Sequence, residues 1–454
     1  MKQFIKSTVA LLLVAVMCFG LVACGNDPVE DPNQNQNQIP GPIDIPTNPQ
    51  QTVPTMPQSG NFLDNVEGLP ATLDNPNISI VYWYNEKQYQ YDTSKKADVY
   101  DPILEAIPYF EEKYGGEVNV IYADWNSMLS TVISLQQSNE APDLFEIYDE
   151  TLYNVILSGV AMDISDYVTD KDMGYYDIRQ DTFQWEGRTY AIPLKPYTMY
   201  IMFNRDLFTL EGLKAPDEMF RDGEWNWSTF RDVCKKLTKT VDGEVTQLAF
   251  GSWEEDILRF MYANNGTLLN VDTATGTVTS NLGNPNTQAT LDYLKDLMGC
   301  FVFGNDMYGW FDNGNLAMIR GKEFPVELPF DVGMVPFPVG DNFDGKALAV
   351  YPQGMAVPNG AKNPEGAVAF MRIVNELQQV VGNQKEASRI GQENYDMIYA
   401  EDVKLVYNYD KGLNDIGTIL ATIVNYLNDG VPAATINANL ESQINSEIEL
   451  RYGK

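Results

Sequence analysis

The chain has 454 residues, a formal net charge of −33 and no histidine. Such an acidic surface disfavours nucleic acid and anionic lipid headgroups as partners, because like charges repel. The lack of histidine excludes Ser–His and Cys–His nucleophile pairs and histidine-ligated zinc, whereas oxygen-ligated calcium and carboxylate-based glycosidase chemistry stay open. The length indicates two or three domains, or two large lobes.

The N-terminus has the pattern of an export signal. Two lysines precede an apolar run from Val9 to Ala23, which is short for a membrane span. The sequence "LVAC" (21–24), followed by glycine, resembles the bacterial lipobox, where cleavage precedes a cysteine that carries a diacylglycerol. We therefore expect a signal peptide over 1–23 and a lipid anchor on Cys24. An ordinary cleaved signal with a chance cysteine is the alternative.

A polar segment follows the expected cleavage point. Residues 24–66 are rich in Pro, Asn and Gln and poor in aliphatic residues. They bury too little apolar surface to offset the entropy of ordering, so we predict a disordered tether over 24–66. The expected location is therefore the outer face of the cytoplasmic membrane, where a coil of this length would hold the folded part roughly 35–40 Å away.

Strands and helices then alternate. The predicted strands are 77–85, 117–125 and 142–149, and the predicted helices are 99–115, 127–139 and 151–159. This alternation predicts parallel strands in an α/β sheet, and the unbroken apolar run of the first strand predicts a sheet covered on both faces. Residues 185–194 predict a hairpin turn that feeds an extended segment.

The alternation restarts at residue 198. The predicted elements are a strand and its exit at 198–208, a helix at 226–239 starting at Ser228 or Thr229, strand, loop and helix over 245–266, a helix at 284–298, an extended segment at 347–360, and helices at 363–377 and 433–451. Residues 272–279 predict a hairpin turn rather than a calcium loop, because Ala and Gly stand where oxygen ligands are needed. No eight-fold barrel pattern is present.

Two cysteines remain after export, Cys234 and Cys300. In an oxidising envelope they could form one disulfide, and the alternative is two buried thiols.

Six motifs in order resemble the family 1 extracellular solute-binding lipoproteins of ABC importers, the sugar-binding group related to maltose-binding protein. They are "NEAPDLFEIYDE" (139–150), "GRTYAIPL" (187–194), "MFNRDLF" (202–208), "WNWSTFRDVCKKLT" (225–238), "WFDNGNLAM" (310–318) and "QGMAVPNGAKNPEGAVAFMRIV" (353–374). Each motif is weak alone, but the set covers nearly all of residues 77–454.

The resemblance implies a two-lobed α/β fold of the periplasmic-binding-protein type (type II), with a ligand cleft between the lobes. Lobe 1 would contain 67–195 and 354–405, and lobe 2 would contain 196–353 and 406–454. It further implies a monomer without catalytic centre, cofactor or metal, which delivers a carbohydrate to membrane permease subunits. ATP hydrolysis belongs to another subunit in that family, and this chain has no phosphate-binding "GxxxxGK[ST]" loop.

Open α/β sheets bind ligands at the carboxyl ends of their strands. Aromatic and carboxylate residues recur at these ends, namely Trp83, Tyr84, Asn85, Trp125, Tyr148, Asp149, Glu150, Trp253 and Glu254. Sugars need this mixture, because the C–H face of the ring packs on aromatic planes while its hydroxyls bond to polar side chains. The alternatives are core packing for the tryptophans and helix capping for Asp149 and Glu150.

The resemblance adds residues from the crossings between lobes, Tyr197, Tyr351 and Gln353. Trp310 precedes one of the motifs and is either a ligand contact or core. Phe324 is a further candidate for stacking on a sugar, although the spacing departs from the family pattern. Trp225 and Trp227 match a helix-start motif, for which packing is the better interpretation.

We therefore expect a transport receptor for a carbohydrate, in particular an oligosaccharide. A receptor for a peptide or polyamine, a sensor that presents its ligand to a signalling partner, and a surface glycosidase are the alternatives. The glycosidase would need two carboxylates about 5 Å to 9.5 Å apart across one glycosidic bond.

Overall fold

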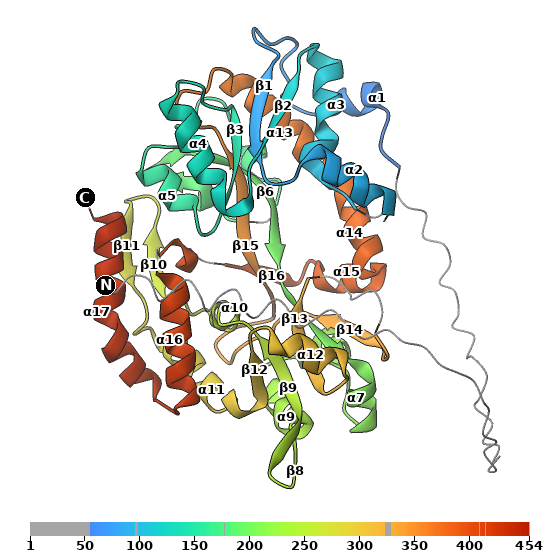
Figure 1. Ribbon diagram of the computed structural model, residues 1–454, viewed down its shortest axis with the longest axis vertical. Coiled ribbons are helices and arrows are strands. Elements are labelled where there is room, and N and C mark those ends of the chain that lie inside the picture. The colour runs from blue at the N-terminus through green and yellow to red at the C-terminus, as the bar shows by residue number, and fades with distance from the viewer. Residues whose placement is uncertain are drawn as a thin grey trace, which may run out of the picture. The chain divides into compact units, whose positions relative to one another are not determined.

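The computed structural model describes residues 55–95, 99–176, 178–322, 328–407, 409–413 and 415–453. The predicted signal peptide, Cys24 and the first part of the predicted tether lie outside these residues. Within the described part, two six-stranded sheets each form the centre of one lobe (Figure 1).

Lobe 1 is built on a sheet of order β16-β15-β3-β1-β2, with β6 also paired to β15. The bounds are β1 (Ile78–Tyr82), β2 (Val118–Tyr122), β3 (Leu144–Tyr148), β6 (Ala191–Thr198), β15 (Lys346–Ala356) and β16 (Val403–Val406). Strand β1 pairs in parallel with both β2 and β3, which confirms the predicted parallel pairing. The carboxyl ends of all three strands therefore lie along one edge of the sheet.

Helices cover both faces of this sheet. They are α1 (Ser59–Leu63), α2 (Glu86–Lys95), α3 (Pro102–Tyr114), α4 (Met128–Gln137), α5 (Leu152–Leu157), α6 (Asp170–Met173) and α13 (Pro364–Leu377). Because side chains alternate along a strand, Ile78, Ile80 and Tyr82 of β1 pack with α3 and α13, while Val81 packs with α4. This arrangement explains the unbroken apolar run in the sequence and confirms a sheet covered on both faces.

Lobe 2 is built on a mixed sheet of order β12-β9-β13-β7-β14, with β8 also paired to β9. The bounds are β7 (Tyr200–Asn204), β8 (Lys239–Val241), β9 (Glu244–Ser252), β12 (Phe301–Phe303), β13 (Leu316–Gly321) and β14 (Val332–Val335). Strand β9 pairs in parallel with β12 and β13, so the loop after β9 lies at a carboxyl edge, as the loops after β1 and β3 do in lobe 1.

The helices of lobe 2 are α7 (Arg205–Leu210), α8 (Pro216–Arg221), α9 (Trp227–Leu237), α10 (Asp256–Tyr262), α11 (Pro285–Lys295), α12 (Asp306–Asp312), α16 (Ile416–Asn428) and α17 (Ala433–Tyr452). Four of them, α9, α10, α11 and α17, correspond to predicted helices, whereas α8, α12 and α16 were not predicted. The predicted start of α9 at Ser228 or Thr229 is wrong by a few residues. Asn226 is the N-cap, and its side chain accepts from the backbone N–H groups of both.

Two antiparallel strands join the lobes. β6 pairs with β15 along most of its length, and its end leads directly into β7 of lobe 2. β15 in turn pairs with β3 through residues 353–356. The helices α14 (Asn383–Ile390) and α15 (Gln392–Ile398) lie beside these strands (Figure 1).

The predicted tether ends too late. Residues 59–63 form α1, and Phe62, Leu63 and Val66 are buried against α3 and its neighbours. Tyr109 Oη also donates to the carbonyl of Pro57 (2.6 Å). These few apolar residues find a preformed surface on lobe 1, which the local composition could not reveal.

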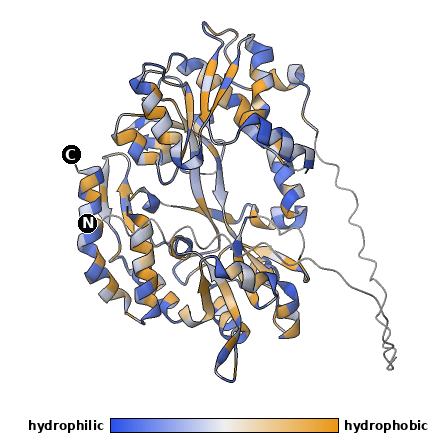
Figure 2. Cartoon of the chain, in the orientation of Figure 1, coloured by the Kyte–Doolittle hydropathy of each residue, from blue (hydrophilic) through white to orange (hydrophobic). Residues whose placement is uncertain are grey.

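Helix α2 was not predicted, because it has almost no apolar face. Its sequence EKQYQYDTSK buries only Tyr89, and Figure 2 shows it as hydrophilic. Two short hairpins were predicted correctly, β4 (Gln184–Trp185) with β5 (Arg188–Thr189) and β10 (Leu269–Asp272) with β11 (Thr277–Ser280). Glu186 and Gly187 adopt positive φ at the first turn.

Cys234 and Cys300 are both free and buried, so the two-thiol alternative describes this structure. Among the described residues, no helix combines the length and the apolar character that crossing a membrane would require.

Candidate functional site

An aromatic strip lies at the carboxyl edge of the lobe 1 sheet. Tyr148 stacks on Trp125 (ring centroids 4.4 Å apart), Trp125 meets Trp83 edge-on (5.8 Å), and Trp83 stacks on Tyr84 (5.2 Å). Trp83 and Trp125 remain 38% and 37% exposed, so neither is a core residue. The structure therefore brings together four residues that the sequence predicted from three different loops.

The strip continues into α2. Tyr84 Oη donates to Asp92 Oδ2 (2.5 Å). Asn85 caps the start of α2, because its Oδ1 accepts a hydrogen bond from the backbone N–H of Gln88 (2.9 Å) in the first turn. Its amide fixes the direction in which the chain leaves the strip.

A buried ammonium group lies beside the strip. The side chain of Lys411 is only 5% exposed. Its Nζ lies 3.6 Å from Asp149 Oδ2, 3.4 Å from Glu150 Oε1, 3.3 Å from Glu255 Oε2 and 3.4 Å from Tyr197 Oη. Asp149 and Glu150 follow β3 in lobe 1, whereas Glu255 follows β9 in lobe 2. Lys411 thus connects carboxylates from both lobes.

A cavity of about 380 Å³ opens next to Lys411. Its lining comprises Glu150, Trp253, Glu254, Glu255, Arg320, Lys411, Ile416, Gly417 and Leu420. Both predicted residues of the loop after β9, Trp253 and Glu254, therefore face the same space as Glu150 from lobe 1. The lining combines one aromatic ring with carboxylates that accept hydrogen bonds, a mixture suited to a polyhydroxylated ligand.

The two strands that join the lobes place a pair of tyrosines under the site. Tyr197 on β6 stacks on Tyr351 on β15, with ring centroids 5.2 Å apart. The Lys411 ammonium lies 4.5 Å from the centroid of the Tyr351 ring, and the Arg259 guanidinium lies 4.6 Å from it. Tyr351 is fully buried, so it supports the site from beneath. Gln353 is opposite Tyr148 in the sheet.

The structure does not bring Trp310 to this site. Trp310 is on α12 and lines a different hollow, together with Val245 and Asn313. Phe324 lies outside the described residues. Trp225 and Trp227 are both 3% exposed, which confirms packing as their role.

Residues 93–376, more than half of the chain, match the family described as bacterial extracellular solute-binding proteins. The chain belongs to this family. The match confirms the resemblance seen in the sequence, and it places the chain among binding proteins rather than enzymes. A binding protein from Brucella abortus (strain 2308) is 22% identical to this solute-binding protein over 344 residues, which are 72% of this chain and 77% of that protein.

Solved structures of binding proteins share the fold. The cyclic α-maltosyl-1,6-maltose binding protein from Arthrobacter globiformis is 12% identical, covers 82% of this chain and 99% of its own, and has a TM-score of 0.64. An ABC substrate-binding protein from Listeria monocytogenes in complex with cycloalternan and UgpB from Mycobacterium tuberculosis in complex with glycerophosphocholine are each 16% identical, with a TM-score of 0.58. Each covers 83% of this chain and 99% of its own. These similarities confirm the two-lobed fold.

The electrostatics of the solute-binding protein's site follow from burial and pairing. Burial raises the pKa of Asp149 to about 6, and the Lys411 ammonium partly opposes this shift. Burial alone would lower the pKa of Lys411, but Asp149 and the other acidic neighbours outweigh it, so the pKa is raised. Lys411 is therefore a cation at neutral pH. Asp149 Oδ2 is buried, has no hydrogen-bond partner among the described residues, and is compensated by the Lys411 ammonium 3.6 Å away.

A network of ion pairs holds the lobe 2 side of the site. Asp256 and Arg259 are both fully buried and paired, and Arg320 Nε lies 3.1 Å from Asp256 Oδ2. Arg320 also reaches Glu255 Oε1 (2.6 Å). Asp256 Oδ2 accepts from the backbone N–H of Trp253 (3.1 Å). The network thereby fixes the loop that presents Trp253.

Sequence reasoning missed Lys411, Glu255, Arg259 and Arg320. The sequence could have indicated Arg259, because an arginine within the apolar stretch "DILRFMYA" is expected to be buried, and a buried cation needs a partner. Nothing in the sequence indicated Lys411, since it lies in a polar loop more than 250 residues from Asp149 in the chain.

Proposed function

We propose that this solute-binding protein captures a saccharide, in particular an oligosaccharide, between its lobes and delivers it to the membrane permease of an ABC importer. The observation that carries the proposal is the exposed aromatic strip beside a carboxylate-lined cavity. Sugar rings present C–H faces to aromatic planes and hydroxyl donors to carboxylates, and the candidate site has aromatic rings beside carboxylates. Two of the structural relatives named above bind saccharides.

A receptor for a free cation such as a polyamine is less well supported. The carboxylates that would bind a cation already surround the Lys411 ammonium. A second cation would have to displace a side chain that is covalently part of the protein. The acidic residues of the site therefore favour a hydroxyl-rich ligand over a polycation.

A thermal-shift screen tests the proposal. The mature protein is screened against neutral oligosaccharides, amino acids, short peptides and polyamines. A saccharide at 100 times its Kd should stabilise the folded state by about 2.7 kcal/mol. Trp253→Ala should abolish the shift, whereas Tyr308→Ala, a change at an exposed aromatic residue on α12, should preserve it. A shift with peptides or polyamines alone would contradict the saccharide proposal.

We also propose that the protein is exported and held at the outer face of the cytoplasmic membrane by a diacylglycerol on Cys24, and that it acts as a monomer. Two acyl chains anchor a protein stably, whereas one is marginal. Cys24→Ala should therefore move the protein from the membrane fraction to the soluble fraction after cell lysis. An unchanged membrane fraction would contradict anchoring through Cys24.

A further inference from the structure

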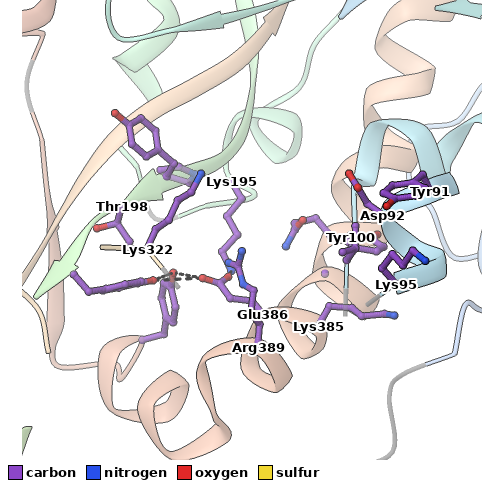
Figure 3. A pocket seen from close by; sticks show the side chains of 17 residues that line it. Tyr91, Asp92, Lys95, Tyr100, Lys195, Thr198, Lys322, Lys385, Glu386 and Arg389 are labelled. Atoms are coloured by element: carbon purple, nitrogen blue, oxygen red, sulfur yellow. Dashed lines mark hydrogen bonds and ion pairs between the residues drawn. The ribbon is translucent and has the colours of Figure 1, made fainter. Parts of the chain in front are cut away.

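A second and larger cavity of about 720 Å³ adjoins the strands that join the lobes. Its walls come from α2 of lobe 1, from β6, from the end of β13 in lobe 2, and from α14 (Figure 3). Of the predicted site residues that the structure describes, Tyr197 alone lines it. The proposed saccharide cleft does not account for this space.

The described lining of this cavity is positively charged, whereas the protein as a whole is strongly negative. Among the described residues, the lining carries five basic side chains, Lys95, Lys195, Lys322, Lys385 and Arg389, and two acidic ones, Asp92 and Glu386, so their charges sum to +3. The whole chain carries 30 basic and 63 acidic residues. A concentration of cations against this background requires a physical reason, because the like charges repel one another. We call this space the basic cavity.

One of the basic side chains, Lys195, is held in place by its surroundings. Lys195 is 19% exposed, its Nζ donates to Asn383 Oδ1 (2.9 Å) and pairs with Glu386, and it lies 4.8 Å from the Tyr399 ring centroid. Burial lowers the pKa of Lys195, Glu386 opposes this, and the nearby Arg389 guanidinium adds to the lowering. Lys195, partly buried and paired with Glu386, thus stands near the exposed Arg389 at the wall of one cavity, and an anion bound there would interact favourably with both cations.

The helix backbone is also unusual at this point. Residues Gln378–Gly382 form a π-helical turn between α13 and α14, and Gln378 and Gly382 both line the basic cavity. Such turns occur mostly as single insertions and are frequent at functional sites. The turn sets the rotation of α14, and with it the direction in which Lys385 and Arg389 point.

The basic cavity is connected to the aromatic strip. Asp92, which accepts the hydrogen bond from Tyr84 Oη, lines the basic cavity, and so does Tyr197, whose ring lies under the Lys411 site. The two spaces differ in the groups they offer a ligand. The smaller cavity is rich in carboxylates, which accept from hydroxyls, whereas the larger one is rich in cations, which donate to oxyanions.

We propose that the basic cavity binds an oxyanion carried by the saccharide, so that the ligand is an acidic saccharide bearing a carboxylate, phosphate or sulfate group. This inference rests on the proposed saccharide-binding function. The acidic outer surface does not oppose binding strongly, because charges farther than about 8 Å are screened at physiological ionic strength. The cations lining the cavity therefore determine the local potential.

Matched ligands test the inference. Isothermal titration would compare oligouronates with their methyl esters, which keep the same backbone but lose the charge, and would include a sugar phosphate, a sulfated sugar and inorganic phosphate. The acid should bind at least about 10-fold more tightly than its ester, in line with the strength of charge-assisted hydrogen bonds. This ratio should fall between 0.05 M and 0.5 M NaCl, since salt weakens charge pairing.

Two double variants locate the effect. Lys385→Gln with Arg389→Gln should bring the ratio of acid to ester affinity close to one. Lys235→Gln with Lys236→Gln makes the same change of charge on the exposed side of α9 and should keep the ratio. Circular dichroism and thermal unfolding would establish that each variant is folded.

Each remaining result overturns the inference. Equal or tighter binding of the neutral ester would do so while leaving the saccharide proposal intact. A ratio unchanged by the α14 variant would place the recognition of the acid elsewhere. Inorganic phosphate that binds without any preference for acidic over neutral saccharides would indicate a site for a free anion. Failure of every saccharide, neutral or acidic, would overturn the proposed function and the inference together.

Discussion

Two buried carboxyl groups behind the aromatic strip of lobe 1 differ from those that frame the site in lobe 2. In lobe 1, Glu146 on β3 and Asp101 before α3 are each 6% exposed, and Glu146 Oε2 has no hydrogen-bond partner among the described residues. Burial raises the pKa of Glu146 to about 8, and nearby Asp101 adds to the shift. Burial likewise raises the pKa of Asp101 to about 6. Glu146 is therefore mainly protonated at neutral pH, behind the aromatic strip. Asp101 stays mostly ionised at that pH and accepts hydrogen bonds from Tyr82 Oη (2.8 Å) and the backbone N–H of Leu104 (2.9 Å).

Lobe 2 keeps its acids charged and pairs them. Asp256 is enclosed with Arg259 and Arg320, and Glu255 is shared by Arg320 and Lys411. Although burial alone would raise the pKa of Glu255, Lys411 and the two arginines lower it. The comparison teaches that lobe 1 presents planar aromatic rings beside the carboxylates of Asp149 and Glu150, whereas lobe 2 presents a rigid network of ion pairs.

Breaking the lobe 2 frame should have the largest effect. Arg259→Met leaves Asp256 without one of its partners in a dry interior, which typically costs about 3–5 kcal/mol. Urea denaturation should show a loss of that size in the free energy of unfolding. Lys236→Met, at an exposed lysine of α9, should change it by less than about 0.5 kcal/mol. Equal losses in the two variants would mean that the buried network contributes no stability of its own.

Removing the lobe 1 face should instead reduce binding. Trp83→Ala combined with Trp125→Ala should raise the Kd for the saccharide by about 10- to 100-fold, equivalent to about 1.4–2.8 kcal/mol. The free energy of unfolding should change by less than in Arg259→Met, because both rings are more than one-third exposed. Titration calorimetry and urea denaturation on the same samples measure both. A loss of stability with unchanged binding would reverse the roles assigned to the lobes.

A smaller effect is expected on the pH dependence of stability, which should show that Glu146 is buried as a protonated acid rather than in an ion pair. Because the pKa of Glu146 rises from 4.5 to about 8 on folding, the folded state holds a proton that the unfolded chain releases. Stability is then fully present below pH 4.5 and is lost as the pH rises towards 8. Glu146→Gln keeps the shape of the side chain but cannot titrate. Between pH 5 and pH 8, the free energy of unfolding of this variant should therefore fall by about 1–3 kcal/mol less than that of the wild type. Exposed Glu112→Gln is the control, and parallel profiles for wild type and Glu146→Gln would refute the assignment.

Much of the fold could be predicted because local patterns specified it. The apolar strands β1 and β3 and the amphipathic helices α9 and α13 have periodicities that their final surroundings only reinforce. The aromatic strip could be predicted for a related reason. Parallel strands put their carboxyl ends at one edge, so residues that follow different strands must meet there.

The rest depends on contacts between distant parts of the chain. Lys411 becomes a site residue only when the loop before α16 is brought against β3, and no local pattern encodes that approach. Trp310 is the opposite case. Its position beside a family motif suggested a place in the cleft, but α12 places it at another surface. Helix α2 lacks an apolar stripe and is held instead by single contacts, such as the hydrogen bond from Tyr89 Oη to Glu105 Oε1 (2.5 Å).

The small helix α1 has a mechanical consequence. Because it packs on α3, the first described helix belongs to lobe 1, the lobe that carries the aromatic strip. A pull transmitted along the preceding chain would act on lobe 1 first and reach lobe 2 through the segments that cross between them. If the proposed anchor on Cys24 holds the chain, a rotation of lobe 2 relative to lobe 1 would leave the attachment to lobe 1 unchanged.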